Sequence, residues 1–137
     1  MINDIKVIKL NVFSNENGNV RHMVKSTDPF FNKFGEIYFS EIFPGKVKAW
    51  SRKKSTTRHY AVVSGEIKLV LSDGIETSEF ILGPENYQLI IIPPGVWSGF
   101  KSVNNQKAII ADLTDFPYSP EDDEKINVNE IKYNWNY

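Results

Sequence analysis

Histidine and cysteine, the side chains that most often supply nucleophiles, general bases and metal ligands, are scarce in this chain. It contains two histidines, His22 and His59, and no cysteine. Disulfides, thiolate-bound zinc, iron–sulfur clusters and cysteine nucleophiles are therefore excluded.

Positive charge is concentrated between Lys46 and Arg58, where six Lys or Arg occur without any Asp or Glu. Such a segment suits a diphosphate, because charge-assisted bonds to phosphate are strong; the alternative is a solvated basic loop. Over the whole chain, 16 Lys and Arg face 17 Asp and Glu, and the net charge is -1. Binding to nucleic acid or to a membrane surface is therefore not expected, and a small molecule is the expected partner.

Short segments rich in β-branched and aromatic residues, bounded by Gly or Pro, must position these side chains. The predicted strands are Glu36–Phe43, Arg58–Val63, Glu66–Leu71, Thr77–Leu82, Gln88–Ile92 and Lys107–Leu113. Tight turns at 64–65 and 72–74 predict hairpins. Strands at this spacing predict an all-β sandwich or barrel. One helical turn is predicted over Asp28–Phe34, with Asp28 as its N-cap.

The chain of 137 residues and 15.7 kDa is expected to form one domain over residues 1–137. Residues 115–137 are a polar, acidic tail that should pack on the barrel or on a partner subunit, because Tyr133, Trp135 and Tyr137 need contacts. No apolar run approaches the roughly 20 residues of a membrane span, and the first ten residues lack a signal peptide's apolar stretch. A cytoplasmic protein is expected.

Two stretches carry a family resemblance, PGKVKAWSRKKSTTRHYAVVSGEIKLVL at 44–71 and QLIIIPPGVWSGF at 88–100. They resemble RmlC-like cupins, and within these the dTDP-4-dehydrorhamnose 3,5-epimerases and related sugar-nucleotide epimerases and isomerases. NENG at 15–18 and TDFPYSP at 114–120 resemble two further segments of that group. The resemblance implies a cupin fold, a double-stranded β-helix jelly-roll barrel, and a nucleotide-linked sugar as ligand.

The cupin metal motif keeps its spacing but not its ligands. Its glycines are present as Gly45 and Gly65, while its ligand positions hold Ser51, Lys53, Arg58 and Ser98. Lysine and arginine are cationic at neutral pH and repel a divalent ion. We therefore expect no metal and no cofactor, as the resemblance to the metal-free epimerases also implies.

The resemblance places the proton-transfer residues of the family at positions that differ here. The family's base, a histidine, aligns with Ser51, and its acid, a tyrosine, falls near Ala111. A serine hydroxyl without an adjacent base is too weak to remove an α-proton at neutral pH. The ordinary 3,5-epimerase mechanism is therefore not expected.

The anion-binding positions of the family, unlike its proton-transfer positions, largely keep their residue character here. Its two diphosphate-contacting residues align with Lys48 and Arg58, and a third, an arginine, falls at Asn17. Strand alternation puts Arg58, Tyr60 and Val62 on one face, which Val62 indicates is the inner one. A buried arginine needs a partner anion, from a side chain or from a ligand.

The remaining reactive side chains each have two interpretations. His22 and Tyr60 are the candidate catalytic residues, although an exposed histidine and a structural tyrosine are the simpler alternatives. The substrate-binding candidates are Lys48, Arg58, Ser51, Asn17, Trp97 and Ser98, and Trp97 could equally pack in the core. Tyr38 could also point into the barrel. Asp112 is a candidate carboxylate or part of a solvated strand end.

Three functions stay open at this stage. The first is a sugar-nucleotide epimerase or ketoisomerase that acts on a nucleotide-linked 4-keto-6-deoxy sugar through altered chemistry. The second is a non-catalytic cupin that binds a sugar nucleotide or serves as a partner subunit, and the third is a structural protein. The resemblance implies a homodimer, because family members pair their sheets and exchange N-terminal strands, and a jelly roll has edges to cover.

Overall fold

The computed structural model describes residues 2–136, and nearly all regular structure in them is β-strand. The strands are β1 (Lys6–Lys9), β2 (Val12–Asn15), β3 (Gly18–Arg21), β4 (Glu36–Ile42), β5 (Val47–Lys53), β6 (Arg58–Ser64), β7 (Ile67–Ser72), β8 (Thr77–Leu82), β9 (Gln88–Ile92), β10 (Trp97–Ser102), β11 (Ala108–Thr114) and β12 (Asp123–Lys125). Two short 3-10 turns, η1 (Ile2–Asp4) and η2 (Val128–Glu130), complete the elements. No helix in the described part of the chain is long and apolar enough to cross a membrane.

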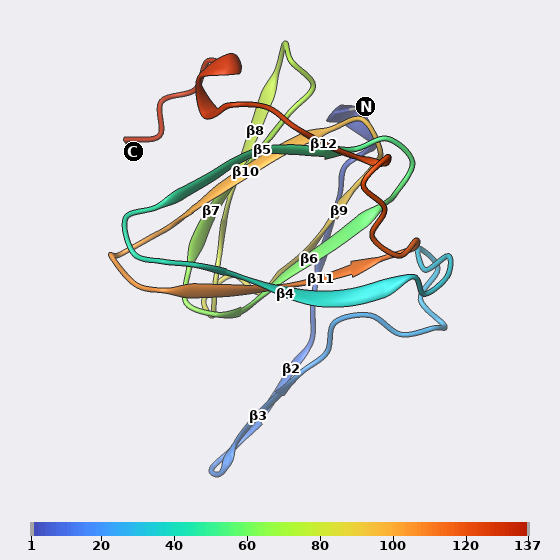
Figure 1. Cartoon of the computed structure of the whole chain (residues 1–137). Helices are drawn as coiled ribbons and strands as arrows, with labels where there is room; N and C mark the ends of the chain where they lie inside the picture. Colours follow the sequence, from blue (N-terminus) through green and yellow to red (C-terminus); the bar gives the residue numbers. More distant parts are fainter. Residues whose placement is uncertain (1, 137) are drawn as a thin grey trace.

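Ten of the strands form two five-stranded sheets that face each other (Figure 1). The first has the order β1-β9-β6-β11-β4 and the second the order β12-β5-β10-β7-β8, with antiparallel pairing throughout. Strands consecutive in the chain are mostly not neighbours, since the chain crosses between sheets, as in a jelly roll. The β2–β3 hairpin extends away from the barrel (Figure 1).

Inward-facing apolar residues of both sheets fill much of the barrel. The buried cluster includes Leu69 and Leu71 of β7, Ile90 and Ile92 of β9, and Ile110 of β11. The chain passes from β6 in the first sheet to β7 in the second at Gly65, whose φ of +77 and contact with the Lys107 carbonyl leave no room for a Cβ atom. The predicted hairpin at 64–65 is therefore wrong, because the two strands do not pair, whereas the hairpin predicted at 72–74 is confirmed by the pairing of β7 with β8.

The segment predicted as a helical turn is irregular. Residues 28–34 contain turns and bends but no helix. The Asp28 carboxylate accepts a hydrogen bond from the backbone N–H of Lys25, which precedes it, and not from the residues that follow. Asp28 therefore closes a turn on its N-terminal side and does not cap a helix.

The C-terminal residues extend the second sheet and cover its outer surface. The chain after β11 crosses the end of the barrel as a strap, which we define as residues 117–126, and adds β12 beside β5 (Figure 1). Beyond it, Tyr133 and Trp135 pack against Trp50, with ring centroids 6.3 and 5.3 Å from the Trp50 ring. Tyr137 lies outside the described residues.

Candidate functional site

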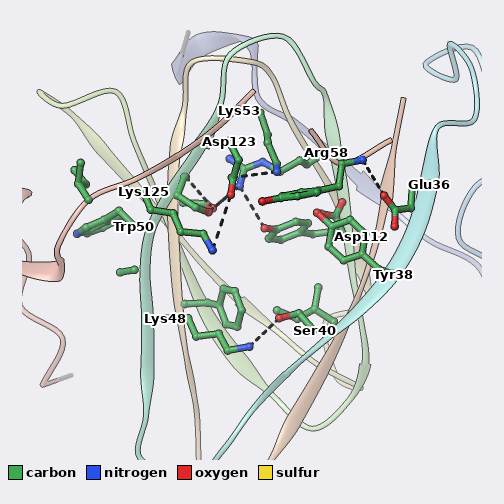
Figure 2. Close-up of a pocket in the computed structure, with 18 residues that line it drawn as sticks. Glu36, Tyr38, Ser40, Lys48, Trp50, Lys53, Arg58, Asp112, Asp123 and Lys125 are labelled. Atoms are coloured by element: carbon green, nitrogen blue, oxygen red, sulfur yellow. Dashed lines mark hydrogen bonds and ion pairs between the residues drawn. The ribbon is translucent and has the colours of Figure 1, made fainter. Parts of the chain in front are cut away.

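A cavity of about 650 Å³ opens between the two sheets (Figure 2). Its polar lining consists of Glu36, Tyr38, Ser40, Lys48, Ser51, Lys53, Arg58, Tyr60, Ser98, Asp112, Tyr118, Asp123 and Lys125. The apolar side chains of Phe100 and Ile110 also line the cavity, and both belong to the buried core cluster. The cavity is therefore the unfilled part of the barrel interior, bounded by strands of both sheets and by the strap.

Arg58 forms part of the inner wall and is 1% exposed. Its Nη1 donates to Ser98 Oγ at 2.8 Å, to Ser51 Oγ at 3.3 Å and to the Tyr60 hydroxyl at 3.4 Å. Its Nη2 donates to the Val96 carbonyl at 2.9 Å, while Nε has no partner among residues 2–136. All of these acceptors are neutral, so the charge of Arg58 must be balanced from elsewhere in the cavity.

Asp112 is the carboxylate that interacts with this charge. It is 2% exposed and hydrogen bonds to the hydroxyl of Tyr38 and, at 3.3 Å, to the backbone N–H of His59. Burial raises the pKa of Asp112 to about 6, although the Arg58 charge and both hydrogen bonds act to lower it. Burial and the neighbouring carboxylate raise the pKa of Tyr38.

This pairing can move a proton at neutral pH. A buried carboxyl with a pKa of about 6 loses and regains a proton more readily than an exposed one, and the Tyr38 hydroxyl is held protonated beside it. Both side chains face the cavity from neighbouring strands, Tyr38 from β4 and Asp112 from β11 (Figure 2). The structure thus brings together an acid and a base that the sequence offered only as secondary candidates.

The family's acid falls near Ala111 by resemblance, and in the structure this position lies outside the cavity lining. Ala111 is directly opposite Phe39 of β4 and Ala61 of β6, and it does not line the cavity. Side chains alternate along a strand, so the next residue, Asp112, points inward. The alternative interpretation of Asp112 as part of a solvated strand end is wrong, because its side chain is buried.

Ser51, the family's base position, and Ser98 face each other in the cavity wall, with their hydroxyl oxygens 3.4 Å apart. Each accepts a hydrogen bond from Arg58. The two serines therefore hold the guanidinium in place. Within residues 2–136, no three His, Asp or Glu side chains gather in an arrangement that could bind a metal ion.

Tyr60 also lines the cavity, and burial raises the pKa of its hydroxyl. Lys48 projects from β5, and its Nζ donates to Ser40 Oγ at 3.1 Å and lies 5.9 Å from the centre of the Phe100 ring (Figure 2). These two sequence candidates share one cavity with Arg58, Ser51 and Ser98.

The other three candidates lie elsewhere in the chain. His22 follows the β2–β3 hairpin beside Phe13, with ring centroids 5.2 Å apart, and Asn17 is in the turn of that hairpin. Trp97 precedes Ser98 in β10 and therefore faces the outer surface of the sheet, where it packs against the Arg52 guanidinium at 4.2 Å. None of these three lines the cavity, although His22 is a predicted catalytic residue and Asn17 and Trp97 are predicted to bind the substrate.

Residues of the strap complete the cavity and were not among the predicted site residues. Asp123 Oδ1 accepts from Lys53 Nζ at 3.1 Å, and Lys125 and Tyr118 also line the cavity. Tyr118 lies in the TDFPYSP segment that resembles the family, but no sequence motif marks Asp123 or Lys125, which lie beyond the matched stretches.

Comparison with known proteins places the chain among sugar-processing relatives. The family model described as FdtA, WxcM-like, C-terminal, matches residues 3–130. A dTDP sugar isomerase from Desulfovibrio desulfuricans G20 is 37% identical, with a TM-score of 0.91, and the match covers 96% of this chain and 90% of that one. The spore coat polysaccharide biosynthesis protein SpsL of Bacillus subtilis (strain 168) is 27% identical over 147 residues, or 99% of this chain and 97% of that protein.

A dTDP-6-deoxy-D-glucose-3,5-epimerase from Legionella pneumophila Philadelphia 1, in complex with dTDP-4-keto-L-rhamnose, has a TM-score of 0.84. It is 20% identical, covering 96% of this chain and 78% of that one, and so demonstrates a shared fold. The predicted all-β cupin fold and the resemblance to the RmlC-like group are thus confirmed.

Proposed function

We propose, on the premise that this chain belongs to the FdtA family of WxcM-like C-terminal domains, that it is a sugar-nucleotide epimerase or ketoisomerase. Its substrate would be a nucleotide-linked 4-keto-6-deoxy sugar, used in deoxysugar or glycan biosynthesis. The observation that carries this proposal is the pairing of the buried Asp112 carboxyl with the half-buried Tyr38 in a cavity that also holds Lys48 and Arg58. The dTDP sugar isomerase at 37% identity supports the same class of substrate.

In this reaction Asp112 is the base that removes the proton from the carbon next to the ketone, C3 in the simplest case. The electron pair of the C–H bond moves onto the C4 oxygen, and the positive charge of Arg58 stabilises the enolate. Returning the proton to the opposite face of C3 gives an epimer. Returning it to C4, while the O3 proton moves to O4, gives the 3-keto isomer.

Tyr38 and Tyr60 are the acids available for the second half of the reaction. The Tyr38 hydroxyl hydrogen bonds to Asp112, so the two can pass a proton between them. The Tyr60 hydroxyl accepts from Arg58 and can donate its own proton to a substrate oxygen. Ser51 and Ser98 orient Arg58, and Lys48 is available for the diphosphate.

A second candidate function, a non-catalytic sugar-nucleotide-binding protein or partner subunit, is favoured by one observation. Ser51 stands at the family's base position and its hydroxyl is engaged with Arg58 and Ser98, so it cannot replace a histidine base. If Asp112 does not act on the substrate, the cavity would only bind it.

Incubation with dTDP-4-keto-6-deoxyglucose separates the two functions. The enzyme proposal predicts a new sugar nucleotide, either epimerised or ketoisomerised, in the proton NMR spectrum of the reaction. Binding of this compound in a calorimetric titration without any change in its spectrum would reject the enzyme and leave the binding protein. The absence of both binding and turnover would reject both functions.

A further inference from the structure

The strap faces the cavity with only one side. In β12, Asp123 pairs in register with Lys53, Glu124 with Arg52 and Lys125 with Ser51. Side chains alternate along a strand, so Asp123 and Lys125 point into the cavity and Glu124 points away from it. Figure 2 shows Lys125 and Lys48 projecting into the same space.

The outward side of β12 fastens the strap to the barrel. Glu124 accepts two hydrogen bonds from Arg52, both at 3.0 Å, and the Arg52 guanidinium lies 4.2 Å from the centre of the Trp97 ring. Asp122 accepts from the hydroxyls of Ser55 and Thr56, each at 2.6 Å. The backbone carrying Lys125 is therefore held in place before any ligand binds.

The inward side carries more positive than negative charge. The Asp123 carboxylate is shared by two ammonium groups, Lys53 at 3.1 Å and Lys125 at 3.9 Å, so one positive charge is in excess. Lys53 is largely buried, whereas the Lys125 side chain is 75% exposed and accessible to a ligand. Lys48 adds a further charge from β5, and the other two carboxylates of the lining, Glu36 on β4 and Asp112 on β11, lie across the cavity (Figure 2).

Arg58 is poorly placed to serve as the phosphate anchor that the sequence suggested. It is 1% exposed, four hydrogen bonds engage its terminal nitrogens, and its charge interacts with Asp112. A diphosphate that approached it would also approach the Asp112 carboxylate. Lys125 and Lys48, by contrast, have accessible ammonium groups that can each contact a phosphate.

We propose that the C-terminal strap is part of the substrate site, and that Lys125 and Lys48 together bind the diphosphate of the sugar nucleotide. This inference rests on the proposed function and extends it to a residue of the tail. Lys125 is accordingly a binding residue, whereas Arg58 and Asp112 act on the sugar ring.

Calorimetric titration with two probes, dTDP and inorganic pyrophosphate, tests the inference. We expect Lys125→Ala to weaken both by about tenfold, as for loss of a charge-assisted bond, and Lys125→Arg to restore most of the affinity. Lys54→Ala, which removes an equal charge next to β5, is the matched control and should leave both affinities unchanged. Thermal denaturation of each variant checks that the fold is retained.

The outcomes separate this inference from the proposed function. Wild-type binding of dTDP that is unchanged in Lys125→Ala overturns the role of Lys125 and leaves the proposed function standing. Binding of pyrophosphate that depends on Lys125, without any binding of dTDP, supports the anion site and contradicts the sugar-nucleotide function. A wild-type protein that binds neither dTDP nor pyrophosphate would overturn both this inference and the proposed function.

Discussion

Asp112 and Ala111 are neighbours in the chain, yet only Asp112 faces the cavity, because side chains alternate along β11. Aligning a motif along the sequence can place a catalytic role one residue away from the side chain that could perform it. The buried position of Asp112 gives it the pKa of about 6 that a base working near neutral pH requires.

The dependence of rate on pH should follow the ionisation of Asp112. A base must be deprotonated, so kcat/KM should rise with pH, reach half of its maximum near the Asp112 pKa of about 6, and then remain level over neutral pH. Steady-state rates measured between pH 5 and pH 9 in one mixed buffer check this. A rate that falls as the pH rises through this interval would exclude Asp112 as the base.

Replacing Asp112 with asparagine should stabilise the protein above pH 6. The folded-state pKa of about 6 lies above the ordinary 3.8, so the folded protein binds this proton more tightly than the unfolded chain does. The Asp112 carboxyl therefore makes its full contribution to the free energy of unfolding below about pH 4, and this contribution is lost as the pH rises through about 6. Urea denaturation at pH 8 should show Asp112→Asn to be about 1–3 kcal/mol more stable than the wild type.

The same comparison at pH 4 serves as the control, because there the wild-type carboxyl is protonated like the amide. The difference between the two proteins should then be small. A variant that is less stable than the wild type at pH 8 would mean that the Asp112 carboxylate stabilises the fold.

At the scale of elements, strands in which polar and apolar residues alternate, or which carry continuous apolar runs, could be predicted from sequence. β8 and β9 begin and end at the predicted residues, β4 and β6 differ by one residue at one end, and β7 and β11 are shifted by one residue at both ends. β5 was not predicted, because its inward face carries Lys48, Ser51 and Lys53 in place of apolar side chains. Those polar residues face a cavity, which local sequence patterns do not reveal.

The strap could not be predicted, because its structure depends on partners far away in the chain. Asp122 bonds to Ser55 and Thr56, and β12 exists only as an addition to β5. Three residues have too little local preference to form a strand alone. Contacts across roughly 70 positions, such as Lys53 with Asp123, create it.

Gly99 allows the C-terminal residues to lie close to the second sheet. A Cβ atom at this position would stand 2.7 Å from the Cβ of Ala49 and 2.9 Å from the Trp135 ring. We expect Gly99→Ala to displace the tail and to lower the free energy of unfolding by about 1–3 kcal/mol. Urea denaturation and the fluorescence of the buried tryptophans measure both effects.

The double variant Ala49→Gly with Gly99→Ala is the matched comparison, because it removes the shorter of the two contacts. It should recover part of the lost stability. Wild-type stability in Gly99→Ala alone would show that the tail does not pack closely on this strand.

At the scale of the whole molecule, the described surface leaves several large apolar side chains exposed. Phe13 and Val20 on the projecting hairpin are 59% and 61% exposed, and Phe39 on the edge strand β4 is 63% exposed. Apolar surface of this kind is typical of an interface between subunits. Together with the resemblance, it supports the prediction of a homodimer.

Light scattering coupled to size-exclusion chromatography should therefore give about twice the chain mass of 15.7 kDa. Phe39→Asp should shift the protein towards the monomer if β4 is in the interface, because a charge would be buried there. Ile75→Asp, at a 93% exposed site between β7 and β8, adds the same charge outside β4 and is the control. A wild-type protein that elutes with the mass of one chain would contradict the prediction.

The cavity as a whole combines groups that no single motif predicts, since both sheets and the tail contribute to it. Lys48, Lys53 and Arg58 come from a segment whose charge is visible in the sequence, whereas the closeness of Tyr38 and Asp112 follows from the pairing of β4 with β11. The central claim is that this cavity removes a proton beside the ketone of a nucleotide-linked sugar.

Exchange in heavy water tests that claim most directly. With dTDP-4-keto-6-deoxyglucose as substrate, the wild type should introduce deuterium at the carbon next to the ketone, as followed by NMR and mass spectrometry. Asp112→Asn should still bind dTDP but exchange at least about 100-fold more slowly, as for the loss of a general base. Exchange by Asp112→Asn at the wild-type rate, or no exchange by a wild-type protein that binds the substrate, would contradict it.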